Sequence, residues 1–195
     1  MRQHGPMLTV ESPLVTDRLR LRPFAPTDTA ALYEMRTDPD VLRYLYWPPA
    51  TLDEVRDVVR QRTTMNRLAE ENDYLVLAVA DRDTDALVGE VDLCWTSVQH
   101  RHGEIGVILR PKAQGRGYAT EAAAALLDLA FTRLSLHRVS ARTDARNTAC
   151  VRVMRRLGMR QEAHLRQCVL HEGRWHDELV LAVLADEWAA HAAGG

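Results

Sequence analysis

The chain has 195 residues, a formal net charge of −2 and three cysteines. This length suits one domain with a sizeable core. The near-neutral charge gives no field for nucleic acid or an anionic membrane, and no apolar run approaches the roughly 20 residues of a membrane span. An odd number of cysteines argues against a disulfide framework, and residues 1–12 lack a secretory signal. We therefore expect a cytoplasmic monomer or homodimer with no nucleic-acid, membrane or metal partner.

The first third of the chain predicts a strand and two helices. We expect residues 1–12 to form a flexible arm and 13–195 a single domain. The first strand covers Arg18 to Leu21, and Thr27 and Asp28 can cap a helix that runs to about Thr37. Thr51 and Glu54 have capping-box spacing, which predicts a long helix ending near Glu71.

The rest of the chain alternates strands with helices. Residues 74–80 and 87–93 alternate as a hairpin, and 105–109 form the next strand. Helical spacing follows over residues 120–134, then a short strand at 137–141 and a helix from Asn147 to Leu157 that Gly158 ends. Two closing strands, about 161–170 and 175–184, flank a turn at Gly173. This order predicts an α/β fold with a mixed sheet and helices on both faces.

A glycine-punctuated basic turn, Gln114-Gly115-Arg116-Gly117, joins the 105–109 strand to the following helix. Backbone N–H groups at such a turn, together with the unpaired donors of a helix start, form an anion site. The P-loop is excluded because no Gly-Lys-Ser/Thr ending is present. The Rossmann fingerprint is excluded because Thr120 stands where that motif requires its third glycine. Although an ordinary tight turn would have the same spacing, the chemistry indicated is pyrophosphate binding.

Four segments resemble one known family. Gln114-x-x-Gly117-x-Ala119 is similar to the acyl-CoA pyrophosphate loop of GNAT-superfamily N-acetyltransferases. Residues 16–23 (Thr-Asp-Arg-Leu-Arg-Leu-Arg-Pro) resemble the opening strand of the Rim-type subfamily, which includes ribosomal-protein N-terminal acetyltransferases. Residues 147–158 resemble its second CoA-side helix, and residues 173–177 with Glu187-Trp188 its closing hairpin strand and terminal helix. The chain is identified as a member on this resemblance, which spans residues 16–188.

The resemblance implies the fold, the co-substrate and the binding residues. The fold would be a mostly antiparallel central sheet of six to seven strands with splayed middle strands, and the co-substrate acetyl-CoA. The strand before the loop would pair with the pantetheine arm, a backbone N–H near Ile108 would hold the oxyanion, and Asn147 would reach CoA. The implied CoA-binding residues are Val107, Ile108, Leu109, Gln114, Gly115, Arg116, Gly117, Tyr118, Ala119, Thr120 and Asn147. Val107 to Leu109 can serve equally as plain core strand.

Acyl transfer to an amine needs a proton acceptor, because an ammonium has no lone pair. Glu104 is the first candidate for this general base, since it begins the strand expected beside the thioester; it also fits a solvent-exposed strand end. Glu90 and Asp92, which share a strand face, are second choices. Asp144 could act from the end of the next strand.

The sequence departs from its relatives at the expected general acid. Met154 occupies the position where many GNAT enzymes carry a tyrosine that protonates the leaving thiolate. Cys150 stands where Rim-type members commonly have serine; it is either the acid or an ordinary helix residue. A nucleophilic Cys150 with His137 as partner is a different possibility. A non-catalytic acyl-CoA-binding module is another.

The acceptor is expected to be a primary amine, either a protein or peptide N-terminus or a small antibiotic or metabolite. Tyr46 and Trp47, within the run Tyr44–Pro49, are the candidate acceptor-binding residues. The same run could instead brace a dimer or pack on the domain's own core. Neither the acceptor nor the length of the acyl group follows from the sequence.

Overall fold

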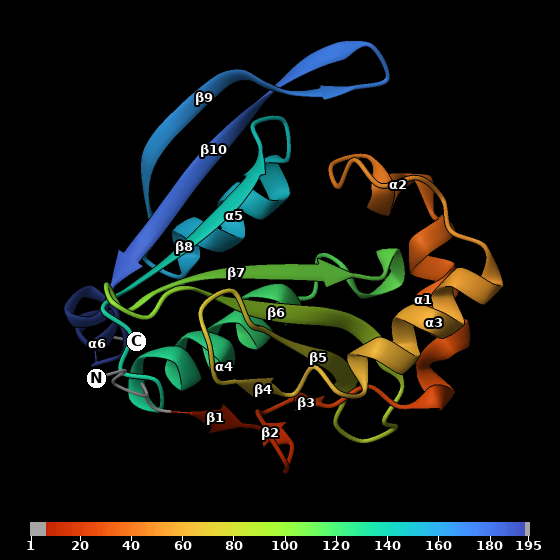
Figure 1. The fold of residues 1–195 in the computed structure, drawn as a ribbon, viewed down its shortest axis with the longest axis horizontal. Coiled ribbons are helices and arrows are strands. Elements are labelled where there is room, and N and C mark those ends of the chain that lie inside the picture. The colour runs from red at the N-terminus through yellow and green to blue at the C-terminus, as the bar shows by residue number, and fades with distance from the viewer. Residues whose placement is uncertain (1–6, 194–195) are drawn as a thin grey trace.

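The computed structural model describes residues 7–193, which form one large sheet with helices on both faces (Figure 1). The strand order is β2-β3-β5-β6-β7-β8-β10-β9, and every pair is antiparallel except β7–β8. This confirms the predicted mixed, mostly antiparallel sheet, although it has eight strands rather than six or seven. The strands are β2 (Leu14–Val15), β3 (Leu19–Arg22), β5 (Tyr74–Asp81), β6 (Leu87–Ser97), β7 (His102–Leu109), β8 (Arg138–Asp144), β9 (Arg160–His171) and β10 (Arg174–Leu184).

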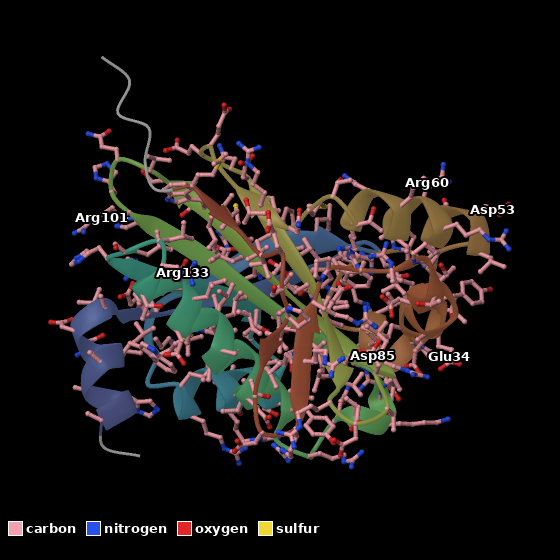
Figure 2. The ribbon with its side chains drawn as sticks, turned by 90° about the horizontal axis from the view of Figure 1, so that it is seen from below. Glu34, Asp53, Arg60, Asp85, Arg101 and Arg133 are labelled. Carbon is pink, nitrogen blue, oxygen red and sulfur yellow. The ribbon has the colours of Figure 1, made fainter. Side chains whose placement is uncertain are left out.

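Two apolar clusters, one on each face of the sheet, hold the helices in place. Along β5, Leu75 and Leu77 face the larger cluster, whereas Val76 and Ala78 face the smaller one, as strand alternation requires. The larger cluster packs α4 (Tyr118–Thr132), α5 (Thr148–Arg156) and Trp188 of α6 (Ala185–Ala193). The smaller one packs α1 (Thr29–Thr37) and α3 (Leu52–Arg62). Figure 2 shows charged side chains on the outer surface of these last two helices, among them Glu34, Asp53 and Arg60.

Two predictions about the N-terminal third are wrong in part. The helix α3 ends at Arg62 rather than near Glu71, and the chain then forms a short strand, β4 (Arg67–Leu68). That strand pairs with β1 (Leu8–Thr9) and buries Leu8 and Leu68. The expected flexible arm is therefore anchored at this pairing, whereas residues 1–6 lie outside the described part. Local spacing alone cannot reveal a partner strand almost sixty residues away.

The predicted helix starts differ in how they are capped. Thr51 and Glu54 form the expected capping box at α3, with the Thr51 hydroxyl accepting from the Glu54 N–H. Asp28 instead turns back, where its carboxylate accepts from the Ala25 N–H at 2.8 Å and pairs with Arg22. A single short helix, α2 (Pro39–Leu42), separates α1 from α3. Within residues 7–193, none of the helices has the length and apolar character needed to cross a membrane.

The two parallel strands separate part of the way along their length (Figure 1). Pairing between β7 and β8 begins at His102 opposite Arg138 and stops at Glu104 opposite Ser140. Beyond that point β7 stays paired only with β6. The edge of β7 from Ile105 to Leu109 is therefore open toward β8, as the predicted splay requires.

Candidate active site

The basic turn before α4 presents a row of free backbone donors. Gly115 and Gly117 adopt φ values of 72° and 83°, in the left-handed region that glycine tolerates best. Gly117 is the N-cap of α4 and provides no capping side chain. Among the described residues, no group accepts a hydrogen bond from the backbone N–H of residues 115–120. Such donors at the positive end of a 15-residue helix form an anion site.

The residues around the turn leave it open on its outer side. A side chain added at Gly115 would meet nothing within 4 Å. The Thr120 hydroxyl is buried without a hydrogen-bond partner in the described part of the chain. Gln114 points the other way and donates from Nε2 to the Leu109 carbonyl at 3.2 Å. Arg116 is exposed beside the donors, so its charge adds to their positive potential.

Alternation along β7 decides which of its backbone groups face the open edge. The Arg110 N–H donates to the Val88 carbonyl on the β6 side. Because donors alternate between the two edges of a strand, the N–H groups of Val107 and Leu109 point toward β8 and that of Ile108 toward β6. Val107 therefore offers its backbone to an added strand-like ligand, and Leu109 offers its N–H, because the Leu109 carbonyl already accepts from Gln114.

A cavity of about 200 Å³ lies where β7 and β8 diverge. Its walls come from β6, β7, β8, α4, α5 and the segment after α2. Three of the predicted CoA-binding residues, Val107, Ile108 and Asn147, line it together with Cys150 and Met154. The structure thus brings together the pantetheine strand and the CoA-side helix that the sequence suggested.

Cys150 is held at the start of α5 with its thiol in this cavity. The Asn147 side chain caps the helix by accepting from the Cys150 N–H at 3.1 Å. Burial raises the pKa of the Cys150 thiol, and a bond with the Thr143 hydroxyl offsets this only in part. His137 precedes the seven-residue strand β8 whereas Cys150 follows it, which separates the two by about 20 Å. A Cys150–His137 pair is therefore not formed.

The candidate carboxylates occupy four different environments. Glu90 is buried and pairs with Arg62, whose Nη2 donates to Oε1 at 3.0 Å. Asp144 accepts from Arg146 and from the Tyr46 hydroxyl. Glu104 is half-buried at the last position of β7 that pairs with β8, and it does not line the cavity. Asp92 does line it.

The neighbouring aromatic residues Tyr46 and Trp47 point in different directions. Trp47 lines the cavity, and the Arg36 guanidinium lies over its ring at 4.2 Å. Tyr46 has a φ of 58°, does not line the cavity, and stacks on His176 of β10 at 5.3 Å. It therefore ties the segment after α2 to the end of β8 and to the closing hairpin. Tyr44 and Leu45 line the cavity as well.

Some residues that line the cavity belong to no motif that could be recognised in the sequence. Arg142 of β8 lines the cavity and pairs with Glu178 of β10 at 2.9 Å. Gly106 lines it from the middle of the open edge. Both positions become recognisable only once the register of β7 and β8 is known.

The free donors of residues 115–120 follow β7 in the chain, and the open edge of β7 borders the cavity that Trp47 also lines. The residues present fit a long diphosphate-bearing thioester such as acetyl-CoA: backbone donors for the diphosphate, a free strand edge for the amide-rich arm, and a cavity for the acyl end. Fold and site together define an acyl-CoA-dependent transferase.

Comparison with known proteins supports the assignment as an acyl-CoA-dependent transferase. The model of the acetyltransferase (GNAT) domain matches residues 18–160, and the chain belongs to this family. The N-acetyltransferase YnaD of Bacillus subtilis is 33% identical over 175 residues, which cover 90% of this chain and 98% of the relative.

Two solved structures extend the comparison. An acetyltransferase of the GNAT family from Bacillus anthracis superposes with a TM-score of 0.80 at 31% identity, covering 89% of this chain and 99% of the other. The spermidine N-acetyltransferase of Vibrio cholerae, in complex with CoA and spermine, has the same fold, with a TM-score of 0.76 at 23% identity over 89% of this chain and 99% of the other.

Proposed function

We propose that this acetyltransferase moves the acetyl group of acetyl-CoA to a primary amine by direct attack within a ternary complex. The observation that carries the proposal is the presence of three features on and directly after one strand, β7. These are the free N–H groups of residues 115–120, the open edge of β7, and the cavity between β7 and β8. An enzyme that formed a covalent acyl intermediate would instead need a nucleophile with a base in reach, whereas among the described residues the Cys150 thiol bonds only with the Thr143 hydroxyl, which is not a base.

The backbone directions of β7 refine the binding roles. The turn at residues 114–120 would hold the diphosphate, and Val107 and Leu109 would pair with the pantetheine arm. We assign the oxyanion contact to the N–H of Val107 or Leu109 instead of Ile108, because the Ile108 donor faces β6. Ile108 would then serve only as part of the cavity wall. Asn147 would hold α5 against the arm.

Cys150 is the group in the cavity best suited to return a proton to the departing thiolate. Its raised pKa keeps the thiol protonated at neutral pH. Met154, in the position where many relatives carry tyrosine, is buried and offers no proton. Direct attack followed by proton return from Cys150 or from water would complete the reaction.

A protein or peptide N-terminus is the first candidate acceptor. The segment Thr16–Pro23 supports this choice, since it resembles the Rim-type subfamily. The cavity of about 200 Å³ admits a slender amine rather than a bulky ring system. An extended N-terminus entering past Trp47 meets that requirement.

A small polycationic amine is the second candidate. Three carboxylates lie at or beside the cavity: Asp92 on β6, Glu104 on β7, and Glu178 on β10, which pairs with Arg142 of the cavity wall. Negative charge here would attract an acceptor that carries several ammonium groups. The Vibrio cholerae enzyme with this fold is described with bound spermine.

Two measurements on the same preparation test the proposal. Calorimetric titration with acetyl-CoA checks the donor site, and CoA release over a panel of N-terminal peptides, spermine and aminoglycosides checks turnover. Turnover of peptides alone favours the first candidate, and turnover of spermine alone favours the second. Binding without turnover of any amine would favour a non-catalytic acyl-CoA-binding module, and no binding would overturn the proposal.

A further inference from the structure

The cavity contains a single carboxylate among its described lining residues, and it belongs to Asp92 of β6. The other charged lining residue, Arg142, is paired with Glu178 on the far side, toward β10. No described residue donates a hydrogen bond to the Asp92 carboxylate, although its near neighbour Glu90 is paired with Arg62. Both oxygens of Asp92 are therefore free to accept from a ligand in the cavity.

The absence of a side chain at residue 106 allows the carboxylate to lie there. Asp92 and Gly106 are opposite one another in the β6–β7 ladder. A Cβ atom placed on Gly106 would collide with Asp92 Oδ1. The carboxylate consequently lies against the main chain in the middle of the open edge, between Ile105 and Val107. This is the stretch of β7 beside which the proposed thioester would lie.

The electrostatic surroundings of Asp92 suit proton exchange near neutral pH. Burial, and then the negative charges of Glu90 and Glu104, raise the pKa of Asp92 to about 7, although the positive charge of Arg62 acts in the opposite direction. A base whose pKa lies near the working pH is the most effective one. The groups that face the carboxylate are thus Glu90 on its own strand, Glu104 on β7, and Arg62 on α3, with Arg142 across the cavity on β8.

We propose that Asp92 is the general base of the acetyl transfer, an inference that rests on the proposed function. Asp92 would take one proton from the acceptor ammonium, which leaves a neutral amine. The nitrogen lone pair would then form the C–N bond at the thioester carbonyl while the C–S bond breaks and its electron pair leaves on sulfur. The nitrogen loses its second proton as the thiolate gains one, so the sum is amide, free CoA thiol and one proton passed from Asp92 to water.

Glu104 has a different part in this scheme. It lies diagonally across the ladder from Asp92, opposite Cys94 and Ser140, and outside the cavity. Its negative charge raises the proton affinity of Asp92 without touching the acceptor. Glu104 is therefore a positioning residue that sets the pH at which Asp92 accepts a proton.

The test compares Asp92→Asn, Glu104→Gln and the exposed turn variant Asp83→Asn in the full chain. With an amine that the wild type acetylates, Asp92→Asn should lower kcat by roughly 100- to 10,000-fold and remove the acid limb of the kcat/KM profile near pH 7. Acetyl-CoA affinity, measured by calorimetry, should stay unchanged. Glu104→Gln should keep the limb and move it to lower pH, and Asp83→Asn should match the wild type.

A second variant tests the geometry. Gly106→Ala places a methyl group where the Asp92 carboxylate lies, so it should lower kcat in the wild type and cost much less in the Asp92→Asn background. An acid limb that survives in Asp92→Asn and disappears in Glu104→Gln would overturn the assignment and make Glu104 the base. A wild type that acetylates no amine would instead refute the proposed function itself, so the two failures are distinguishable.

Discussion

Arg18, the residue just before β3, binds the carboxylate of Glu121 on α4 through both its side chain and its backbone. Nε donates to Oε2 at 2.7 Å, and the backbone N–H donates to Oε1 at 2.9 Å. The same guanidinium donates from Nη1 to the Arg116 carbonyl at 2.9 Å and lies over the Tyr118 ring. A residue immediately before β3 thus contacts the backbone of the turn at Arg116 and the first residue of α4, Tyr118, so it supports the conformation of the turn.

Arg18→Ala should therefore weaken acetyl-CoA binding without changing the chemistry. The contacts are partly exposed, so we expect a loss of about 1 kcal/mol, or roughly fivefold in Kd, with kcat at saturation nearly unaltered. Calorimetry and steady-state kinetics measure the two quantities. Arg20→Ala, two residues further along the chain and with only a 3.9 Å contact to Asp85, is the matched control. Equal affinity in both variants would show that Arg18 does not support the turn.

The sequence predicted well what depends on neighbouring residues along the chain. The turn at residues 114–120, the Asn147 cap and the hairpin at Gly173 are local patterns, and each forms as expected. Local patterns could not decide whether Glu104 or Asp92 is the better candidate for the general base. That choice depends on cross-strand register, which places a glycine opposite Asp92 and a cysteine opposite Glu104.

The conformation of the loop after α2 could not be predicted from local sequence patterns either. Tyr46 and Trp47 are adjacent and chemically similar, yet only Trp47 reaches the cavity. The left-handed backbone of Tyr46 turns its ring toward His171 and His176, where the Asp144 carboxylate fixes its hydroxyl. Those partners come from segments about 100 residues or more away and become visible only in the folded chain.

Trp47→Ala should raise the acceptor KM by about tenfold and leave acetyl-CoA affinity nearly unchanged, because the ring lines the cavity but lies away from the donor turn. Initial rates over an acceptor series, with calorimetry for the donor, measure both. The exposed hairpin residue Trp175 provides the control variant Trp175→Ala. A lower melting temperature with no change in KM would mean that Trp47 only packs against Arg36.

Cys150→Ala should retain part of the activity, and Cys150→Ser should retain most of it. A thiol kept protonated by burial can return a proton to the thiolate, and a serine hydroxyl can do the same. We expect the alanine variant to lose no more than roughly 100-fold in kcat. Single-turnover assays and intact-mass analysis check for an acyl-enzyme, with exposed Cys168→Ala as the control. Abolished turnover in both variants together with an acetylated wild-type chain would establish the covalent route.

The free energy of unfolding should reveal the cost of keeping Asp92 in the cavity. Its folded pKa, about 7, is higher than the roughly 3.9 of an unfolded aspartate. Between these values the native state binds the extra proton, so this group makes stability fall as the pH rises, and the full penalty is present above pH 7.

Asp92→Asn removes that penalty and should therefore stabilise the protein at pH 8, by on the order of 1 to 4 kcal/mol, and much less at pH 5. Denaturant unfolding at the two pH values measures the difference, and Asp83→Asn should show no such pH dependence. A variant that is inactive and yet more stable at high pH would show that Asp92 serves the reaction at a cost in folding stability. A variant less stable at both pH values would instead mean that the carboxylate holds the β6–β7 ladder together.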